Sequence, residues 1–405
     1  MKDTEIKPAC NAGIYQIHNF IRKMFQEGLY DKLIEYINSC IKSRQGKSFE
    51  PVQINPVSIN LDLISACNFY CDHCIDLDII KNGYLLKFGN IKKLIEPWVK
   101  DGLRSVIIIG GGEPTLHPDF EEIIAFLKSK GLEVGIASNG SRLSRLADIA
   151  HLLNGRDWVR LSLDAGTDET FQKMHNPRLN INLDQILKDV KAMRDKHSNY
   201  QMGFSYLVIS DDHVANNRNL INNIREISLA AQKAKESGFS YFSIKPFISP
   251  LGHRPTEFKR QFIEEIKKQV IMAKECEDKN FRVIESFNLL ALLNGFDAKL
   301  KIQPKICHVQ FFRLVVCPDG VFNCTLWRGF DMSYLVDPRG EINEEFFDAL
   351  RAKSIERLEN FDASKECSEV SCIYNDFNWF VEDMINNPEK LKQLKKTEDF
   401  FDYFL

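Results

Sequence analysis

Three cysteines in the first fifth of the chain have a spacing that could hold a metal centre. Cys67, Cys71 and Cys74 stand in the segment Cys-Asn-Phe-Tyr-Cys-Asp-His-Cys, directly after a short apolar stretch. Thiolates are the usual ligands of iron–sulfur clusters, and a four-iron cubane normally takes four of them. No fourth cysteine is close in the sequence, so three ligands would leave one iron open to a bidentate small molecule.

Two other interpretations of this loop stay open from spacing alone. Positions i, i+4 and i+7 lie on one face of a helix, so the three cysteines could be packing residues. Alternatively, His73 could join the three thiolates around a tetrahedral zinc ion. The loop follows the first predicted strand, and parallel barrels place their chemistry at that end of their strands. Its position therefore favours the iron–sulfur interpretation.

A second group of cysteines lies in the last hundred residues. Its members are Cys307, Cys317, Cys324, Cys367 and Cys372, whereas Cys10, Cys40 and Cys276 are isolated. A hairpin is predicted between the first and third members of the group, with its turn at Asp319-Gly320. Clustered cysteines in a cytosolic protein are typical of metal ligands or catalytic thiols rather than disulfides. A structural zinc site with four cysteines is one such arrangement.

The elements that must position these cysteines alternate along the chain. Six apolar runs are predicted as strands, at 59–65, 105–110, 132–138, 158–164, 202–209 and 239–247. Helical stretches fall near 118–130, 142–153, 182–196 and 217–237. Strands separated by helices of this length indicate βαβ units and a parallel sheet. The predicted fold class is α/β, with a partial (β/α)6 TIM-like barrel; a doubly wound open sheet is the competing arrangement.

Four regions are predicted along the 405 residues. They are a helical N-terminal extension (1–54), the partial barrel (55–250), a helical connector (251–300) and a small cysteine-rich domain with C-terminal helices (301–405). The net charge of −3 and the lack of a basic tract argue against nucleic acid and acidic membranes as partners. No secretory signal or membrane-length apolar run is present, so we expect a soluble, cytoplasmic protein.

Several short motifs resemble those of the radical S-adenosylmethionine (SAM) superfamily and occur in the same order. The cysteine loop resembles the superfamily's cluster signature, and Gly110-Gly111-Gly112-Glu113-Pro114 resembles its GGE motif. Ser138-Asn139-Gly140 follows the third predicted strand, and Ser162-Leu163-Asp164 ends the fourth. Each turn alone is common, but together they are in register with the cysteine loop over residues 57–247.

The resemblance implies a [4Fe-4S] cluster on Cys67, Cys71 and Cys74, with SAM at the open iron. It also implies SAM contacts from His73, Gly111, Gly112, Glu113, Ser138, Asn139, Ser162 and Asp164. The glycine motif would engage the SAM amino group, the end of the fourth strand its ribose or carboxylate, and His73 its adenine, where an aromatic residue is usual. Reductive cleavage of SAM would give a 5′-deoxyadenosyl radical that removes a hydrogen atom from a substrate.

The second cysteine group resembles the twitch or SPASM extensions that follow many radical SAM barrels. The resemblance implies one auxiliary [4Fe-4S] cluster, because five cysteines cannot saturate two. The implied ligands are Cys307, Cys324, Cys367 and Cys372; Cys317 is spare, but could replace any of them because the Cys-x4-Cys spacing departs from the family pattern. Cys317 and Cys372 are also candidate hydrogen-atom donors to a substrate radical, as in epimerases of the superfamily.

The substrate is less constrained by the sequence. Residues 1–54 lack the strands of the winged-helix peptide-recognition domain found in many peptide-modifying members, so we expect a small molecule, such as a sugar-derived natural product. Its dehydrogenation, epimerisation or decarboxylation would make the chain an oxidoreductase or isomerase, with a flavodoxin or ferredoxin as the reductase. A peptide maturase and a non-catalytic zinc-binding protein are the alternatives. Lys245 could face the active site, and Arg313 and Arg328 could bind a carboxylate or phosphate of the substrate, but we expect a solvated lysine and surface-paired arginines.

Overall fold

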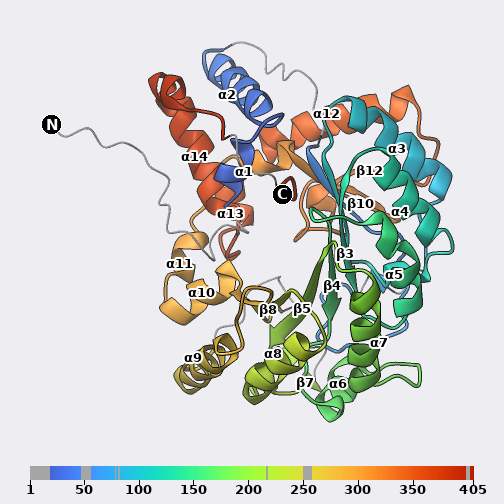
Figure 1. Cartoon of the computed structure of the whole chain (residues 1–405). Coiled ribbons are helices and arrows are strands. Elements are labelled where there is room, and N and C mark those ends of the chain that lie inside the picture. The colour runs from blue at the N-terminus through green and yellow to red at the C-terminus, as the bar shows by residue number, and fades with distance from the viewer. Residues whose placement is uncertain are drawn as a thin grey trace.

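The computed structural model describes residues 19–46, 56–77, 79–80, 83–215, 218–249, 258–397 and 402–405. A ten-stranded sheet lies at its centre, in the order β12-β11-β10-β1-β2-β3-β4-β5-β8-β9 (Figure 1). Its strands are β1 (Ser58–Leu61), β2 (Ser105–Ile108), β3 (Glu133–Ser138), β4 (Trp158–Ser162), β5 (Gln201–Val208), β8 (Tyr241–Pro246), β9 (Arg282–Glu285), β10 (Arg313–Cys317), β11 (Gly320–Phe322) and β12 (Tyr334–Val336).

The sheet confirms the predicted α/β class and the partial barrel. Neighbouring strands from β10 through β1 to β9 are parallel, and only β10–β11 and β11–β12 are antiparallel. The six predicted barrel strands are β1, β2, β3, β4, β5 and β8. The sheet stays open, because β12 and β9 are its two edges.

The helices of the described chain cover the sheet and its ends. They are α1 (Phe20–Met24), α2 (Tyr30–Arg44), α3 (Phe88–Lys100), α4 (Phe120–Ser129), α5 (Leu143–Ile149), α6 (Asp168–His175), α7 (Leu183–Lys196), α8 (Ile227–Glu236), α9 (Arg260–Lys274), α10 (Phe287–Asn294), α11 (Asp297–Leu300), α12 (Glu344–Asn360), α13 (Ala363–Glu366) and α14 (Asn375–Asn386). In Figure 1, α3, α4, α5 and α7 form one layer outside the sheet. Each buries an apolar stripe; in α4 the stripe is Phe120, Ile123, Ile124 and Leu127.

Strand β4 shows how the sequence sets the inner face of the barrel. Val159 and Leu161 are buried in the main core, while the alternate residues Arg160 and Ser162 are half-buried. Successive side chains of a strand point to opposite faces. The residues of β4 that do not enter the helix-covered core therefore face the inside of the partial barrel.

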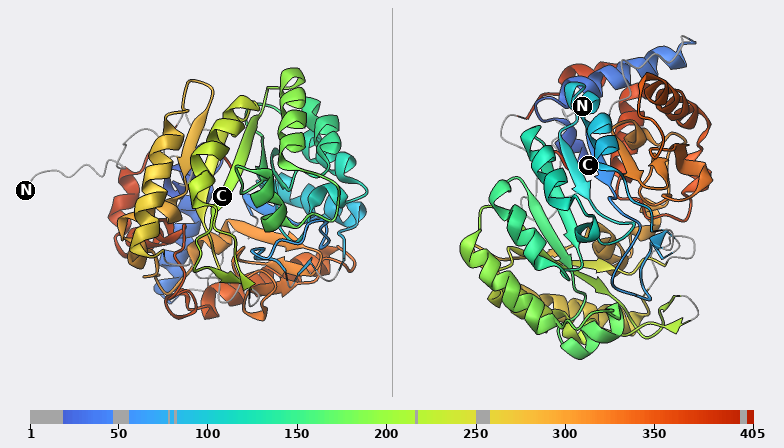
Figure 2. Two further views of the ribbon diagram at one scale, coloured as in Figure 1. Left: turned by 90° about the horizontal axis from the view of Figure 1, so that it is seen from below. Right: turned by 90° about the vertical axis from the view of Figure 1, so that its right-hand side faces the viewer.

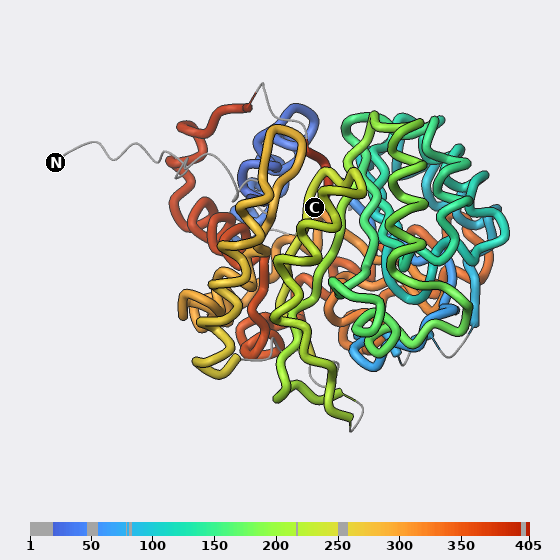
Figure 3. The backbone as a smooth tube through the Cα atoms, turned by 60° about the horizontal axis from the view of Figure 1, so that its bottom comes forward, coloured from blue at the N-terminus to red at the C-terminus, as the bar shows by residue number. Residues whose placement is uncertain are grey.

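Two segments depart from the predicted elements. The connector at 251–300 contains α9, α10 and α11, but it also contributes β9, which extends the sheet beyond β8. The predicted helix at 217–237 begins only at Ile227, because the short hairpin of β6 (Val214–Ala215) and β7 (Arg218–Asn219) precedes it. In Figure 3 this yellow-green hairpin projects from the lower edge of the molecule.

The C-terminal cysteine region joins the barrel sheet directly. Strand β10 pairs in parallel with β1, in register from Ser58↔Arg313 to Leu61↔Val316. Strands β10 and β11 form the predicted hairpin, with Cys317 opposite Gly320. The second cysteine group is thus attached to the same sheet as the first.

The two ends of the described chain meet in a second apolar core. Helices α1 and α2 pack against α14 there, and Arg44 pairs with Glu382 of α14 at 2.5 Å. Figures 2 and 3 show the blue N-terminal helices beside the red C-terminal ones. No helix in the described chain is both long enough and apolar enough to span a bilayer.

The last residues cover the N-terminal ends of three barrel strands. The Tyr403 carbonyl accepts a hydrogen bond from Ser105 Oγ at the start of β2, at 2.7 Å. The Phe404 ring lies 5.6 Å from the ring of Trp158, at the start of β4. This tail covers the barrel floor below β2, β3 and β4, at the end opposite the cysteine loop.

Candidate active site

A cavity of ≈ 500 Å³ lies at the C-terminal ends of the barrel strands. Its lining contains most of the residues predicted for cluster and SAM binding: Cys67, Cys71, His73, Cys74, Gly112, Glu113, Ser138, Asn139, Ser162 and Asp164. Gly111 does not line it; its backbone N–H points instead to Asp76 Oδ2, at 3.3 Å. The structure thus brings the early cysteines and the predicted SAM contacts into one space.

The cysteine loop is irregular backbone between β1 and α3, not a helix. The interpretation of the three cysteines as one packed helical face is therefore wrong. Cys67 Sγ accepts hydrogen bonds from Phe69 N at 3.5 Å and from Asn139 Nδ2 at 3.7 Å. All three cysteines are half-buried and line the cavity, which is the placement that metal ligands need.

Burial changes the acid–base properties of these thiols. It raises the pKa of Cys67, and it raises the pKa of Cys74 to about 12. The pKa of Cys71 is raised well above its ordinary value by burial and by the proximity of Cys74 and Cys67. The thiols are therefore protonated in the metal-free chain, and binding of iron must release their protons.

A histidine that the sequence did not point to completes the environment of Cys71. His175, at the end of α6, places Nδ1 3.2 Å from Cys71 Sγ and Nε2 2.9 Å from the Leu163 carbonyl oxygen. A carbonyl only accepts, so Nε2 carries the proton and Nδ1 accepts from the Cys71 thiol. Ligand atoms of Cys71, His73 and His175 lie within 4.8 Å of one another. A zinc ion would fit this trio, in place of the predicted combination of His73 with three cysteines.

Glu113 ties the glycine motif to the end of β3. Its carboxylate accepts hydrogen bonds from Thr115 Oγ1 at 2.6 Å, Ser138 Oγ at 2.8 Å and Asn139 N at 2.7 Å. Burial raises the pKa of this carboxyl group, and these donors act in the opposite direction. Glu113 and Ser138 are thus hydrogen-bonded to each other. Together with Thr115 and Asn139, they hold the turn that forms this part of the cavity wall.

The glycine motif also packs on the start of the cysteine loop. The Glu113 N–H donates to the Ala66 carbonyl at 2.8 Å. A side chain at Gly112 would overlap the carbonyl oxygens of Ala66 and Ile64. Glycine is therefore required here by close approach of two backbones, and the motif and the loop form one rigid unit.

Asp164 lies just beyond β4 in a left-handed conformation, with φ +51°. Its Oδ1 accepts from Leu207 N at 2.7 Å, and its Oδ2 is 3.5 Å from both His73 Nε2 and His175 Nε2. Burial alone would raise the pKa of Asp164, but His73 and His175 lower it. Residues other than glycine seldom adopt a positive φ, and those that do are often found at functional sites.

Two cations line the cavity that we did not expect there. Lys245, at the end of β8, faces the cavity and is not a solvated strand-end lysine. Arg160, two residues before Ser162 on β4, lines the same cavity. The sequence did contain a signal for Arg160. It lies two residues before Ser162, and alternate residues of a strand point to the same face.

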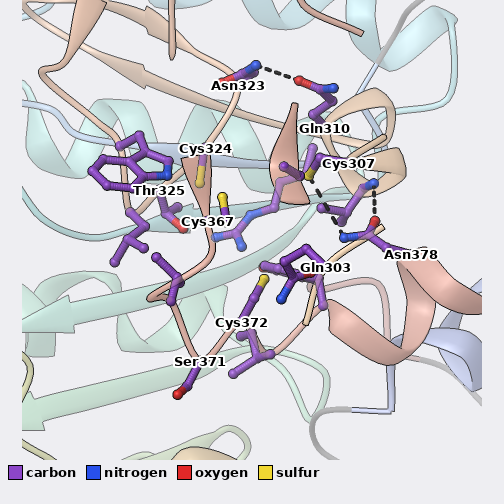
Figure 4. Close-up of a pocket in the computed structure, with 18 of the residues that line it drawn as sticks. Gln303, Cys307, Gln310, Asn323, Cys324, Thr325, Cys367, Ser371, Cys372 and Asn378 are labelled. Carbon is purple, nitrogen blue, oxygen red and sulfur yellow. Dashed lines mark hydrogen bonds between the residues drawn. The ribbon is translucent and has the colours of Figure 1, made fainter. Parts of the chain in front are cut away.

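The second cysteine group lines a separate cavity of ≈ 250 Å³. Cys307, Cys324, Cys367 and Cys372 all belong to its wall, and Figure 4 shows the sulfur atoms of Cys324 and Cys367 pointing toward each other. Burial raises the pKa of each of these four thiols. The structure thus places in one cavity the four cysteines that the resemblance to twitch or SPASM extensions implied as ligands.

Cys317 lies apart from those four. Its Sγ donates to the Gly320 carbonyl at 3.3 Å, inside the β10–β11 hairpin, and it packs with Val315 and Phe322. Cys317 is not among the described residues that line either cavity. Cys372 lines the smaller one. This placement gives Cys317 no contact with either cavity, as a ligand or as a hydrogen-atom donor.

The two arginines near the second group are not surface residues. Arg328 is 8% exposed and donates to the buried Asp62 at 2.7 Å and to Asp76. Arg313 lines the smaller cavity and donates to Asn60 Oδ1 at 2.6 Å. The expectation of surface ion pairing was wrong because both partners of Arg328 lie more than 250 residues away in the sequence.

The two cavities adjoin. Ile75, Ile248, Asn288 and Ile373 belong to the walls of both. The Oδ1 atom of Asn288 is buried and has no hydrogen-bond partner among the described residues. An acceptor without a donor at the junction of two cavities is available to a bound molecule.

The donor set fits the groups that the sequence implied. Three thiols without a fourth in the larger cavity suit a cubane with one open iron, and four thiols in the smaller one suit a fully ligated cluster.

Comparisons with known proteins agree with this arrangement. The chain is 28% identical over 304 residues to a probable GTP 3′,8-cyclase of Saccharolobus solfataricus, covering 73% of this chain and 91% of that protein. It is 32% identical over 108 residues to an S-adenosylmethionine-dependent nucleotide dehydratase of a Thermoplasmatales archaeon, covering 27% of this chain but only 38% of that protein. The fold resembles Streptococcus suis SuiB bound to its precursor peptide SuiA, with a TM-score of 0.55 and 12% identity over 78% of this chain and 70% of that one.

A family model described as the radical SAM superfamily matches residues 61–221, which begin at the end of β1 and include the cysteine loop and β2 to β7. Members of this superfamily are enzymes that use a [4Fe-4S] cluster and SAM. The motif order, the open parallel sheet and these matches agree with one another: residues 61–221 are similar to the radical SAM superfamily.

Proposed function

We propose that the chain cleaves SAM at a [4Fe-4S] cluster held by Cys67, Cys71 and Cys74, and acts on a small molecule bound between the two cysteine-lined cavities. The observation that carries this proposal is the shared cavity: three thiols, the glycine motif and the end of β4 line one space of ≈ 500 Å³. A reductase such as a flavodoxin or ferredoxin would supply the electron.

The bound cluster and SAM would supply a 5′-deoxyadenosyl radical that removes a hydrogen atom from the substrate. The residues of the chain hold and orient these groups. The three thiolates would bind iron, the backbone of Gly112 would face the SAM amino group, and Ser162 and Asp164 would contact its ribose or carboxylate. His73, held 3.5 Å from Asp164, would lie against the adenine. The barrel walls exclude water from the reacting atoms.

We further propose that Cys307, Cys324, Cys367 and Cys372 hold an auxiliary [4Fe-4S] cluster of the twitch or SPASM type. Their common cavity supports a metal centre rather than four unrelated packing cysteines. The alternative occupant of this site is a structural zinc ion, which the same four thiols would hold. The shared wall of the two cavities supports a role for this centre in substrate binding or electron exchange.

Two substrate classes fit the fold. A small molecule is favoured because the adjoining cavities of ≈ 500 and ≈ 250 Å³ have the size of small-molecule sites. Its dehydrogenation, epimerisation or decarboxylation would be consistent with a hydrogen-abstracting site. A peptide is the second candidate, because the similar SuiB structure has its precursor peptide bound.

Anaerobic reconstitution with iron and sulfide tests the cluster proposal. We expect a brown protein with about eight irons per chain, roughly four for each cubane. Replacing Cys67, Cys71 and Cys74 together by Ala should remove about half of the iron and all 5′-deoxyadenosine formation from SAM with dithionite.

A matched variant separates the two centres. Replacing Cys307, Cys324, Cys367 and Cys372 by Ala should remove the other half of the iron, and Cys276→Ala, whose thiol lines neither cavity, should remove none. Continued SAM cleavage by the early triple variant would refute the proposal. A colourless protein with stoichiometric zinc would instead support the non-catalytic zinc-binding alternative.

A further inference from the structure

Two cations, Arg160 and Lys245, line the larger cavity, and Asp164 is the one carboxylate in its described lining whose charge acts on both. Arg160 on β4 and Lys245 on β8 both line the cavity, on either side of β5. Arg160 is level with Gly203 of β5 and Tyr241 of β8, whereas Lys245 is level with Leu207, nearer the C-terminal ends of the strands. Because Gly203 has no side chain, the space above β5 at this level is left to the Tyr241 ring and to the long side chains of its neighbours.

Neither cation makes an ion pair or a hydrogen bond with the described part of the chain. The Arg160 guanidinium lies 5.2 Å from the Trp158 ring, and its Nε is buried without a hydrogen-bond partner among the described residues. The Lys245 ammonium group makes no hydrogen bond with the described residues, and Asp164 is the carboxylate whose charge acts on it. A buried guanidinium or ammonium group is normally paired, so these two present unused binding capacity.

The carboxylates in the cavity wall are already engaged elsewhere. Asp76 pairs with Arg328, and Glu113 accepts from Ser138, Asn139 and its own turn. Asp164 accepts from Leu207 N and faces two histidines. The end of the cavity between β4 and β8 therefore has an excess of positive charge.

Burial and the charge of Arg160 lower the pKa of Lys245 well below its ordinary value, although the charge of Asp164 acts in the opposite direction. The positive charge of Arg160 thus disfavours the charged form of Lys245. An anion placed between them would remove this cost and would gain two charge-assisted hydrogen-bonding partners.

We propose that Arg160 and Lys245 form a subsite for an oxyanion, a carboxylate or phosphate group, that belongs to the substrate. This inference rests on the proposed function and adds a chemical class to its substrate: an acidic small molecule. The subsite lies at the β4–β8 side of the cavity, whereas the cysteine loop and the glycine motif lie at β1 and β2. The arginine fork gives the site a preference for planar or tetrahedral oxyanions.

SAM itself carries a carboxylate, so the test must distinguish two sources of the same chemistry. Inorganic pyrophosphate is the substrate-independent probe, titrated calorimetrically into the reconstituted protein already saturated with SAM. The same protein without pyrophosphate is used to measure the SAM dissociation constant by equilibrium dialysis. The variants are Arg160→Gln, Lys245→Gln and the double change, with Lys188→Gln on the exposed side of α7 as the control that removes one positive charge.

We expect each single variant to weaken pyrophosphate binding at least tenfold, and the double variant to abolish it. Lys188→Gln should leave that affinity within twofold of the unmodified chain. Arg160→Lys and Lys245→Arg, which keep the charge, should recover part of the affinity. Iron content and thermal unfolding identify any variant that fails to fold. If the Arg160 variants do not fold, the test rests on Lys245→Gln, because Lys245 lies closer to the C-terminal end of its strand.

Two results would overturn the inference. Equal pyrophosphate binding by the unmodified chain and the double variant would show that these cations hold no oxyanion. A tenfold loss of SAM affinity in the variants, with SAM-saturated protein unable to bind pyrophosphate, would assign the subsite to the SAM carboxylate. Failure of the proposed function would be recognised separately, by SAM cleavage that survives loss of Cys67, Cys71 and Cys74.

Discussion

Arg328 donates a hydrogen bond to Asp76, and this contact joins the segment after Cys324 to the segment after Cys74. The same guanidinium donates to Asp62, at the end of β1, at 2.7 Å. A side chain at Gly110 would overlap the guanidinium, so this glycine leaves the space through which Arg328 reaches the cysteine loop. One buried cation thus links both cysteine regions and the glycine motif.

Arg328→Gln should destabilise the chain and disturb both centres. Burial raises the pKa of Asp62 to about 7 even though Arg328 opposes this effect, so loss of the cation leaves a buried carboxylate uncompensated. Breaking a buried ion pair from one side costs about 3–5 kcal/mol. We expect the unfolding temperature to fall by several degrees in differential scanning calorimetry.

The double variant Arg328→Gln/Asp62→Asn serves as the control, because its two neutral side chains can still form a hydrogen bond. It should regain a large part of the lost stability. If the single and double variants unfold at the same temperature as the unmodified chain, the ion pair contributes nothing to the link between the two regions.

Glu113→Ala should weaken SAM binding. The change removes the acceptor shared by Thr115, Ser138 and Asn139 and leaves their donors unpaired in the cavity wall. The turn that contacts SAM should then lose its geometry, and a loss of about 1–3 kcal/mol of binding free energy would raise the SAM dissociation constant roughly five- to 150-fold. Equilibrium dialysis with reconstituted protein measures this change.

Two companion variants check the reason for the loss. Glu113→Gln keeps an acceptor for Ser138 and should be less harmful than Ala. Glu122→Ala, at an exposed position of α4, should have no effect. An affinity for SAM that is the same in Glu113→Ala and Glu122→Ala would mean that Glu113 does not organise the site.

His213 should make the chain less stable in acid. Its ring is buried between Phe247 and Phe258, at centroid distances of 5.1 and 5.0 Å, and burial lowers its pKa to about 4. In the unfolded chain a histidine takes up its proton near pH 6.5. The stability from neutral His213 is therefore complete above about pH 6.5 and is lost as the pH falls toward 4.

Thermal unfolding of the unmodified chain and of His213→Phe, compared at each pH between 5 and 7.5, measures this contribution. The difference in unfolding temperature should shift in favour of the variant as the pH falls. His151→Phe, which removes an exposed histidine, should not reproduce the trend. A constant difference for His213→Phe across the range would contradict the assignment.

Gly203→Ala should disturb the inner packing of the barrel. A methyl group at this position of β5 would overlap the Tyr241 ring of β8, which fills the space above the glycine. Overpacking of this kind costs about 1–3 kcal/mol. The variant should unfold at a lower temperature, and its pyrophosphate affinity should change because Tyr241 adjoins Arg160.

Gly340→Ala is the matched control, because the methyl group would have no neighbour within 4 Å. Its unfolding temperature should stay within about a degree of that of the unmodified chain, since surface substitutions are usually worth less than 0.5 kcal/mol. Equal effects of the two variants would show that the cost comes from the backbone and not from contact with Tyr241.

Local sequence patterns predicted the elements that build the barrel. The apolar, β-branched runs at 105–110 and 132–138 became β2 and β3, because a strand covered on both faces must be apolar along its length. Strand β9 was missed because it has only four residues and begins and ends with charged ones. Short strands of this kind differ little in pattern from the loops beside them.

Long-range pairing decided what the sequence could not predict. Strand β10 was recognised as half of a hairpin, but its partner β1 lies about 250 residues earlier, and no local pattern encodes that contact. The same holds for His175 beside Cys71 and for the burial of Arg328. The motifs identified the early cysteine site because its residues all follow strand ends, which a parallel sheet brings to one edge.

The backbone pairing of β1 with β10 has a mechanical consequence. Val57 N donates to the Phe312 carbonyl at 2.7 Å and Asp62 N to the Val316 carbonyl at 2.8 Å, so the two strands are fastened at both ends. The region that carries the later cysteines cannot swing open like a hinged flap without tearing the edge of the sheet. The distance between the two thiol-lined sites is therefore held by the sheet, and any movement that opens the cavities must come from loops rather than from separation of these strands.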